Sequence, residues 1–530
     1  MLNPHLHEEL AKNQARVVVK TRFGPVTGGR ASTGTAVFLE IPYALPPARF
    51  EDPVPLPDDF RYEDKEYIRE ETYGVQPNND GQARDTPFED KVGLGSPSEN
   101  PLFLNIVAPP SFPEQRNFPV KIYIHGGFLQ FGSPHTLGSQ AQYIAAERSE
   151  VWVNIGYRLS AFGFLACDKP LLKGNYGFKD QWLALEWVKA NIAAFGGNPD
   201  DIQLTGLSAG AHSVHQLLHH ASRLPEGQKA PFHSAILQSN AILTNPSTPK
   251  EYRVQFQALC RALGLDPESP DILATLQDRV KVPWSSITHA IETDMLGTNG
   301  TFRGCLVEDW LVTSPDPMTW QRSGGLAKGL REHGVRSIVV GDLAEEWYLY
   351  SIAHPIHTTA DVAPNLRRYF PQDVVDGLIQ KWRTIPDDAG SEEAQKLYGE
   401  ILSCGQVHLP IRLLVEDLHA ANFPVFRYYI EWTPEQHRVE GYVTHGTDRC
   451  LWALRVPTLE PHEVEVAKRW LDRIDAEIKQ LEKEDKPARG IKAILTLGED
   501  REIRWTEDKK WDELIALKGV LPGNIVAGST

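Results

Sequence analysis

Short apolar runs alternate with amphipathic stretches through most of the chain. The runs typical of buried strands are residues 121–127, 151–159, 202–207, 234–239, 337–342 and 423–430, and long helical patterns lie at 180–195 and 464–484. Buried strands separated by helices are characteristic of a sheet that helices cover on both faces. The sequence therefore predicts an α/β fold with a mostly parallel central sheet.

Two stretches, residues 60–100 and 245–330, are less regular. In sheet enzymes such insertions usually lie over the carboxyl ends of the strands and shape the pocket, although surface decoration explains each of them as well. The chain contains no internal repeat and no linker. We therefore expect residues 1–530 to form one domain, with a helical insertion at 245–330.

Composition narrows the partners and the compartment. The 530 residues carry a net charge of −16, whereas nucleic acids and anionic membranes require a basic surface, so we expect neither partner. The five cysteines lie far apart without a C-x-x-C pair, which argues against a zinc or redox motif. We find no run long enough to span a bilayer and no signal peptide, and we expect a reduced, cytoplasmic protein.

Candidate chemistry centres on a serine between a predicted strand and a predicted helix. Ser208 is flanked by Gly206 and Gly210 in the spacing G-x-S-x-G of a nucleophile elbow. Alone, this motif does not distinguish a nucleophile from a serine among small residues. A serine nucleophile also needs a histidine base, a carboxylate that orients the base, and amides that bind an oxyanion.

An H-G-G sequence is the first candidate for these additional groups. A predicted strand leads directly into His125, Gly126 and Gly127. Glycines let backbone amides approach a substrate closely, and such a loop before the elbow commonly contributes oxyanion donors. By itself, the sequence is equally consistent with an ordinary glycine turn.

Six segments in the first half of the chain extend this pattern. They are FLEIPYALPPARF, SENPLFLNIVAP, IYIHGGFLQFGS, NIGYRLSAFGFL, the long segment from GNYGFKD to GLSAG, and FHSAILQS. In this order they resemble the successive blocks of the type-B carboxylesterase/lipase family, which includes the cholinesterases. The resemblance is strong over residues 20–240 and thins to isolated motifs by residue 450. It implies an α/β-hydrolase fold and ester hydrolysis through an acyl-enzyme.

The resemblance also implies a triad in the order Ser, Glu, His. Its nucleophile is Ser208. The segment GDLAEEWYLY is similar to the family's G-x-N-x-D-E-G block and places the acid at Glu346, with Glu345 as the alternative. The segment GYVTHGTDRCLW resembles the block that carries the base and nominates His445.

The same resemblance implies oxyanion donors at Gly126, Gly127, Phe128 and Ala209. Phe128 stands where the family has a third glycine. Its amide can still donate if the loop keeps its conformation, whereas a backbone that requires positive φ disfavours phenylalanine. The benzyl group also narrows the acyl side of the predicted pocket.

Other departures from the family concern the pocket and the C-terminus. Leu207 replaces the acidic residue that usually precedes the nucleophile, and we expect Leu207, Ser239 and Asn240 to line a pocket that attracts cations poorly. Pro101 replaces a cysteine, so the disulfide-closed loop of secreted relatives is not expected. Residues 455–530 diverge, and we interpret them as a capping helix rather than an interaction surface.

We therefore expect a serine esterase for small or medium-sized uncharged esters, lactones included. The chemistry requires neither a metal nor an organic cofactor, and the expected partner is a small-molecule ester. Acyl transfer to another acceptor and a non-catalytic binding role of the same fold remain alternatives. The sequence leaves the oligomeric state open.

Overall fold

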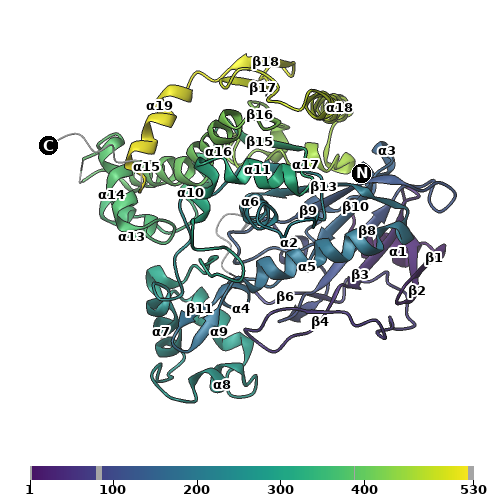
Figure 1. Cartoon of the computed structure of the whole chain (residues 1–530), viewed down its shortest axis with the longest axis horizontal. Helices are drawn as coiled ribbons and strands as arrows, with labels where there is room; N and C mark the ends of the chain where they lie inside the picture. The colour runs from purple at the N-terminus through teal and green to yellow at the C-terminus, as the bar shows by residue number, and fades with distance from the viewer. Residues whose placement is uncertain (1–2, 79–85, 387, 523–530) are drawn as a thin grey trace.

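A twelve-stranded sheet runs through the molecule (Figure 1). The computed structural model describes residues 3–78, 86–386 and 388–522. Parts of two predicted regions, residues 79–85 within 60–100 and residues 523–530 at the C-terminus, lie outside the described residues. The strands in spatial order are β1 (Arg16–Thr21), β2 (Gly24–Arg30), β3 (Ala36–Pro42), β8 (Phe103–Ala108), β10 (Val151–Ile155), β9 (Phe118–Ile124), β13 (Gly197–Leu207), β14 (Ser234–Gln238), β15 (Ser337–Leu343), β16 (Val425–Ile430), β17 (Ala493–Leu497) and β18 (Ile503–Glu507).

The sheet is parallel in its centre and antiparallel at its edges. Pairing is parallel from β10 through β17, whereas β1, β2, β3, β8 and β18 pair antiparallel with their neighbours. Each apolar run in the sequence overlaps one of the central strands, and the remaining parallel strand, β17, lies where the pattern identified no strand. The predicted parallel core is therefore confirmed, and the antiparallel strands come from segments in which the pattern identified no strand.

Both faces of the central strands are buried. Along β15, Ile338 and Val340 belong to one apolar cluster, and Val339, which points to the opposite face, belongs to another. Successive side chains of a strand point to opposite faces, so a strand covered on both faces is apolar at every position. This explains why these strands appear as continuous apolar runs.

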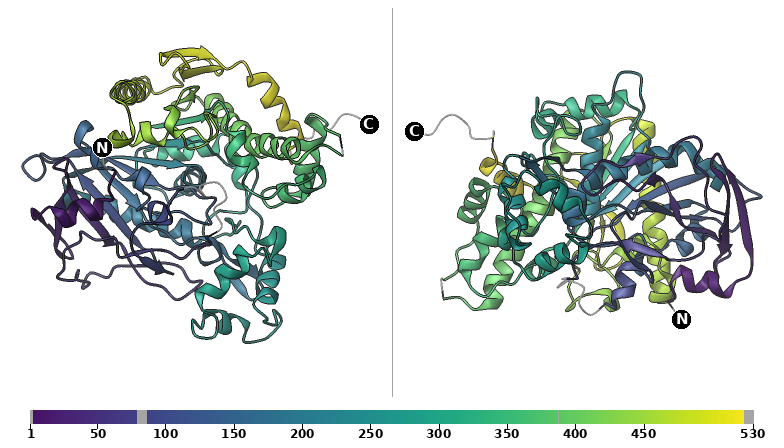
Figure 2. Two further views of the ribbon diagram at one scale, coloured as in Figure 1. Left: turned by 180° about the vertical axis from the view of Figure 1, so that it is seen from behind. Right: turned by 90° about the horizontal axis from the view of Figure 1, so that it is seen from below.

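Helices cover the two faces (Figure 2). Helices α5, α6 and α16 pack on the face of the larger cluster, and α3 and α18 pack on the other. The helices outside residues 245–330 are α1 (Leu6–Lys12), α2 (Phe88–Val92), α3 (Gln142–Arg148), α4 (Ser160–Phe164), α5 (Tyr176–Asn191), α6 (Ala209–Ala221), α12 (Trp347–Ser351), α13 (Val362–Leu366), α14 (Gln372–Lys381), α15 (Ser391–Ser403), α16 (Leu409–Ala420), α17 (Arg449–Trp452), α18 (Pro461–Glu484) and α19 (Trp511–Ala516).

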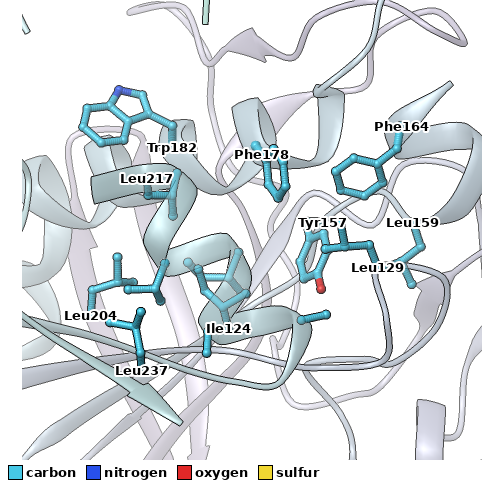
Figure 3. Close-up of a cluster of buried hydrophobic side chains, with 14 of the residues drawn as sticks. Ile124, Leu129, Tyr157, Leu159, Phe164, Phe178, Trp182, Leu204, Leu217 and Leu237 are labelled. Atoms are coloured by element: carbon cyan, nitrogen blue, oxygen red, sulfur yellow. The ribbon is translucent and has the colours of Figure 1, made fainter. Parts of the chain in front are cut away.

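The larger cluster lies directly beneath the predicted elbow (Figure 3). Leu204 on β13 and Leu237 on β14 face Leu217 on α6, and all three side chains are fully buried. Burying such a side chain stabilises the fold by roughly 1.5–3 kcal/mol. The packing fixes α6 against the strand that precedes it.

The predicted insertion at 245–330 contains helices: those up to residue 292 lie at one end of the molecule, whereas the last two pack against α6 and α16 (Figure 1). They are α7 (Arg253–Ala262), α8 (Ile272–Gln277), α9 (Trp284–Glu292), α10 (Pro317–Arg322) and α11 (Gly325–Glu332). Short two-stranded ribbons complete the fold: β4 (Ala44–Leu45) with β5 (Val54–Pro55), β6 (Thr72–Gly74) with β7 (Ser96–Ser98), and β11 (Ala166–Asp168) with β12 (Leu171–Lys173). The division into one domain and an insertion stays a prediction.

Helix α18 packs one apolar stripe against the sheet. Trp470 is fully buried, with its ring 5.7 Å from that of Tyr428 on β16 and 5.8 Å from that of Trp452. The opposite side of the helix is charged and exposed, as at Lys479. This contact supports a capping role for the C-terminal region.

We expect Trp470→Ala to lower the free energy of unfolding by about 3–5 kcal/mol, because it opens a cavity between α18 and the sheet. Lys479→Ala on the exposed side of the same helix should change it by less than about 0.5 kcal/mol. Urea denaturation of both variants measures the difference. Equal stability of the two variants would show that α18 does not cap the core.

Candidate active site

The predicted nucleophile lies on a sharp turn between β13 and α6. Ser208 has φ 59° and ψ −124°, a region that non-glycine residues occupy rarely and at a cost of about 1–3 kcal/mol. Its amide donates to the carbonyl of Gln238 at 2.8 Å, and its carbonyl accepts from the amide of His212 at 2.9 Å. These bonds hold the strained residue between the strand and the helix.

The glycines on either side of Ser208 are required by space. A Cβ atom on Gly206 would lie 2.3 Å from the carbonyl carbon of Gly210. A Cβ on Gly210 would lie 2.1 Å from the carbonyl oxygen of Ile124, at the end of β9. The turn therefore brings α6 into direct contact with the strand that leads to the H-G-G sequence.

The H-G-G sequence follows that strand and passes beside the elbow. A Cβ on Gly126 would lie 2.8 Å from the carbonyl oxygen of Leu207 and 2.9 Å from Cβ of Ser208. The His125 ring stacks on Tyr157 at 4.5 Å, and burial lowers its pKa to about 4. A neutral, buried imidazole thus anchors the start of the loop.

The two residues that follow Gly126 both have positive φ: 111° at Gly127 and 54° at Phe128. No described residue accepts a hydrogen bond from either amide. The expectation that positive φ would exclude phenylalanine is wrong at this position, because aromatic neighbours hold the ring. The ring centroid of Phe128 lies 5.9 Å from that of Tyr350 and 5.8 Å from that of Tyr369.

The loop is also tied to the segment 245–330. The side chain of Gln130 donates to the carbonyl of Phe302 at 2.6 Å and accepts from its amide at 3.1 Å. A paired amide of this kind fixes both position and orientation. The insertion therefore supports the loop from behind.

The predicted base and acid are in contact. Nδ1 of His445 lies 2.6 Å from Oε2 of Glu346, and the carboxylate is fully buried. The second carboxylate oxygen accepts from the amide of Leu343 at 3.0 Å. The hydroxyl of Thr444 accepts from the amide of Leu349 at 3.1 Å, which joins the histidine loop to α12. Backbone amides thus hold the Glu346 carboxylate directly and the loop of His445 through Thr444.

Glu345, the alternative acid, points elsewhere. Its carboxylate accepts from the amide of Val443 at 2.8 Å, and its own amide donates to the carbonyl of Val443 at 3.0 Å. It therefore fastens the histidine loop to the end of β15, and Glu346 is the residue that contacts the His445 ring.

The other ring nitrogen of His445 is unpaired. Nε2 of His445 is buried and has no hydrogen-bond partner among the described residues. His445 and Ser208 line the same cavity, which has a volume of 570 Å³. Gly126, Gly127, Phe128 and Leu207 line it as well. One ring nitrogen is thus paired with a carboxylate while the other is free for a proton in the cavity.

Comparison with known proteins adds the family. A model described as the carboxylesterase family matches residues 15–473. The chain belongs to this family. It is 30% identical over 518 residues to an uncharacterized esterase/lipase of Schizosaccharomyces pombe, covering 93% of this chain and 92% of the relative. It is 36% identical over 455 residues to liver carboxylesterase B-1 of Rattus norvegicus, covering 79% of this chain and 76% of the relative.

Solved structures agree on the fold. A PNB esterase superimposes with a TM-score of 0.72 at 23% identity, covering 94% of this chain and 99% of the other. The carboxylesterase described here therefore has the α/β-hydrolase fold, and it is a carboxylic ester hydrolase.

Not every predicted pocket residue lines the cavity of this carboxylesterase. Leu207 does, but Ser239 and Asn240 are fully or almost fully buried away from it. The amide of Ser239 continues the sheet to the carbonyl of Gly341 at 2.8 Å, and the side chain of Asn240 contacts Gln406 at 3.4 Å. The end of β14 is thus covered by protein, which corrects the prediction for these two residues.

Other walls of the cavity come from segments that the sequence did not single out. They are residues 136–139 and the residues on either side of His445 between 437 and 458. Residues 76–78 and 86–92 also line the cavity and belong to the irregular stretch 60–100, whereas no lining residue in the described part of the chain belongs to 245–330. That insertion instead supplies Trp284 and His289 to a neighbouring cavity, which shares Gln76 and Phe88 with this one. Its role in shaping the pocket stays a prediction.

Sequence reasoning also missed a second buried carboxylate behind His445. Asp448 is fully buried and accepts from the indole N–H of Trp452 at 2.8 Å, while its Oδ1 has no partner among the described residues. Burial raises the pKa of Asp448 to about 6, and the charge of Glu346 acts in the same direction. The sequence signal that could have identified Asp448 is its position three residues after His445.

We expect Gly210→Ala to lower the free energy of unfolding by at least about 2 kcal/mol, since the new methyl group overlaps Ile124 at the end of β9. Gly490→Ala is the matched control, because a Cβ there meets nothing within 4 Å. Chemical denaturation of the two variants measures the contrast. A Gly210→Ala enzyme with the stability of the control would contradict the close contact between α6 and β9.

Proposed function

We propose that Ser208, His445 and Glu346 are the catalytic triad of this carboxylic ester hydrolase. The observation that carries the proposal is the 2.6 Å contact between His445 and a buried Glu346, combined with an unpaired Nε2 on a histidine that lines the same cavity as Ser208. A carboxylate on Nδ1 fixes the tautomer in which Nε2 accepts a proton.

The proposed reaction begins at the elbow. His445 removes the proton of Ser208 as the hydroxyl attacks the ester carbonyl, and Glu346 stabilises the imidazolium that forms. The imidazolium then protonates the leaving alcohol. Water activated by the same histidine attacks the acyl-enzyme, releases the acid and regenerates Ser208.

Backbone amides at Gly127, Phe128 and Ala209 form the proposed oxyanion hole, with Gly126 allowing the loop to approach. The amides of Gly127 and Phe128 lack acceptors among the described residues. Ala209 is the first residue of α6, where amides have no intrahelical partner and the helix dipole favours negative charge. Donors that are fixed before reaction stabilise the developing charge without reorganisation.

The proposed substrates are small or medium-sized uncharged esters, including lactones. Leu207 and Phe128 present apolar surface beside Ser208, and the volume of 570 Å³ lies within the range of small-molecule sites. We further propose that the protein works in a reducing compartment, the cytoplasm. All five cysteines are free and buried, as expected where disulfides do not form. The described helices include none that is both long and apolar enough for a bilayer.

We expect Ser208→Ala to lower kcat/KM for p-nitrophenyl butyrate by at least about 10³-fold, the scale of nucleophile removal in serine hydrolases. The assay uses wild type and variant at matched concentration, with circular dichroism confirming the fold of each. Full activity in the variant would overturn the assignment of the nucleophile.

A paired substitution separates the two neighbouring glutamates. Glu346→Gln should lower kcat by about 10³- to 10⁴-fold, because an amide no longer selects the productive histidine tautomer. Glu345→Gln should stay within about threefold of wild type, since an amide oxygen still accepts from Val443. The reverse order of activities would exchange the roles of the two residues.

A further inference from the structure

A second cavity lies next to the cavity of Ser208, and the aromatic rings of Phe128 and Tyr369 meet between the two. Its volume is 350 Å³, and it is lined by residues of α6, of 244–252, of 303–304 and of 367–372. Tyr369 lines this cavity, and its ring contacts that of Phe128, which lines the cavity of Ser208. One pair of rings therefore separates the two spaces.

The cavity contains an arginine, Arg303, that has no acidic partner among the described residues. Nη1 of Arg303 donates to the carbonyl of Tyr369 at 2.8 Å, and its guanidinium stacks over the Tyr369 ring at 5.5 Å. The groups that act on its charge are Tyr252, Tyr369 and Tyr350, none of them a carboxylate. Burial lowers the pKa of Arg303, as expected for a cation removed from water without a counter-ion.

Two further arginines lie beside it. Arg368 is engaged by Asn365 and by Asp294, whereas the exposed Arg367 has no acidic partner among the described residues. The one carboxylate in the described lining, that of Glu251, accepts from the amide and the hydroxyl of Thr248 at 2.6 and 2.8 Å. A protein with a net charge of −16 thus concentrates positive charge in this cavity.

The wall on α6 is polar and neutral. Gln216 is almost fully buried, its Nε2 lies 3.3 Å from Nε2 of His212, and its Oε1 has no partner among the described residues. Burial lowers the pKa of His212 well below its usual value, so the ring adds no positive charge. The positive charge in the described lining therefore comes from its three arginines and not from His212.

We propose that this cavity binds a small carboxylate, which pairs with the guanidinium of Arg303. An unpaired charge enclosed by protein is costly, and an anion of matching geometry removes that cost. The planar fork of arginine binds a carboxylate through two parallel hydrogen bonds. The tyrosines around it supply apolar surface for a short aliphatic chain.

The carboxylate has two conceivable sources, and both place it next to the reaction. It is either a free small acid or the distal end of an acyl group that extends past Phe128. Helix α6 borders both spaces, because the amide of His212 donates to the carbonyl of Ser208 at 2.9 Å. A distal carboxylate would extend the proposed substrates from uncharged esters to half-esters of dicarboxylic acids.

Titration calorimetry with adipate tests the site without requiring catalysis. We expect wild type to bind adipate, with neutral adipamide giving no signal, and Arg303→Gln to weaken binding by at least about tenfold, the scale of one charge-assisted hydrogen bond. Arg303→Lys keeps the charge and should weaken it less. Arg116→Gln, which removes the same charge from an exposed position, is the matched control and should bind as wild type.

Failure to bind adipate at about 20 mM would overturn the proposal, as would unchanged binding by a folded Arg303→Gln protein. If that variant does not fold, Arg303→Lys replaces it: the loss of the planar fork should weaken adipate binding, while Arg367→Gln should bind as wild type. Wild-type-like adipate binding by Arg303→Lys would then overturn the proposal. A wild-type protein without esterase activity would contradict the proposed triad, whereas the adipate-binding result would still stand.

Kinetics identify the source of the carboxylate. For mono-p-nitrophenyl adipate, Arg303→Gln should lower kcat/KM about tenfold while p-nitrophenyl hexanoate stays within about twofold, if the acyl group carries the anion. If the anion is a separate ligand, Arg303→Gln should change kcat/KM for both esters by the same factor, and wild type should still bind free adipate. A faster reaction of the adipate ester with Arg303→Gln than with wild type would contradict both forms of the proposal.

Discussion

The contact between the first turn of α6 and the end of β9 is the constraint on which the rest of the site depends. Gly210 leaves no room for a Cβ against the carbonyl of Ile124, and Gly126 leaves none against the elbow. Two backbones are thus pressed together at the point where one carries Ser208 and the other begins the loop of free amides. The parallel sheet beneath them, buried on both faces, supplies the packing that holds this strained arrangement in place.

Phe128 shows how side-chain packing sustains an unfavourable backbone. Its positive φ is compatible with the fold because Tyr350 and Tyr369 hold the ring and Gln130 holds the next turn of the loop. The same ring lines the cavity of Ser208 and contacts Tyr369, which lines the space around Arg303. Phe128 thereby connects the geometry of the loop, the cavity of Ser208 and the proposed anion site.

The sequence identified what depends on short, local motifs. Six central strands follow from contiguous apolar runs and are confirmed, whereas β17 and the antiparallel strands had no such run. The roles of Ser208 and His445 stay predictions. Glu345 and Glu346 could not be separated, because adjacent residues differ in the direction of their side chains and only the fold sets that direction. Ser239 and Asn240 were misplaced for a related reason: their position after a strand does not reveal that other segments cover them. Arg303 comes from a distant loop, and no local pattern marks its lack of a counter-ion.

The central claim is that strained backbone at Ser208 and Phe128 assembles a nucleophile beside an oxyanion hole. A crystal structure of the protein treated with a p-nitrophenyl phosphonate measures this directly. The account predicts a single adduct on Oγ of Ser208, with the phosphonyl oxygen about 2.7–3.1 Å from the amides of Gly127, Phe128 and Ala209. An adduct on another residue, or a phosphonyl oxygen directed away from these amides, would contradict it.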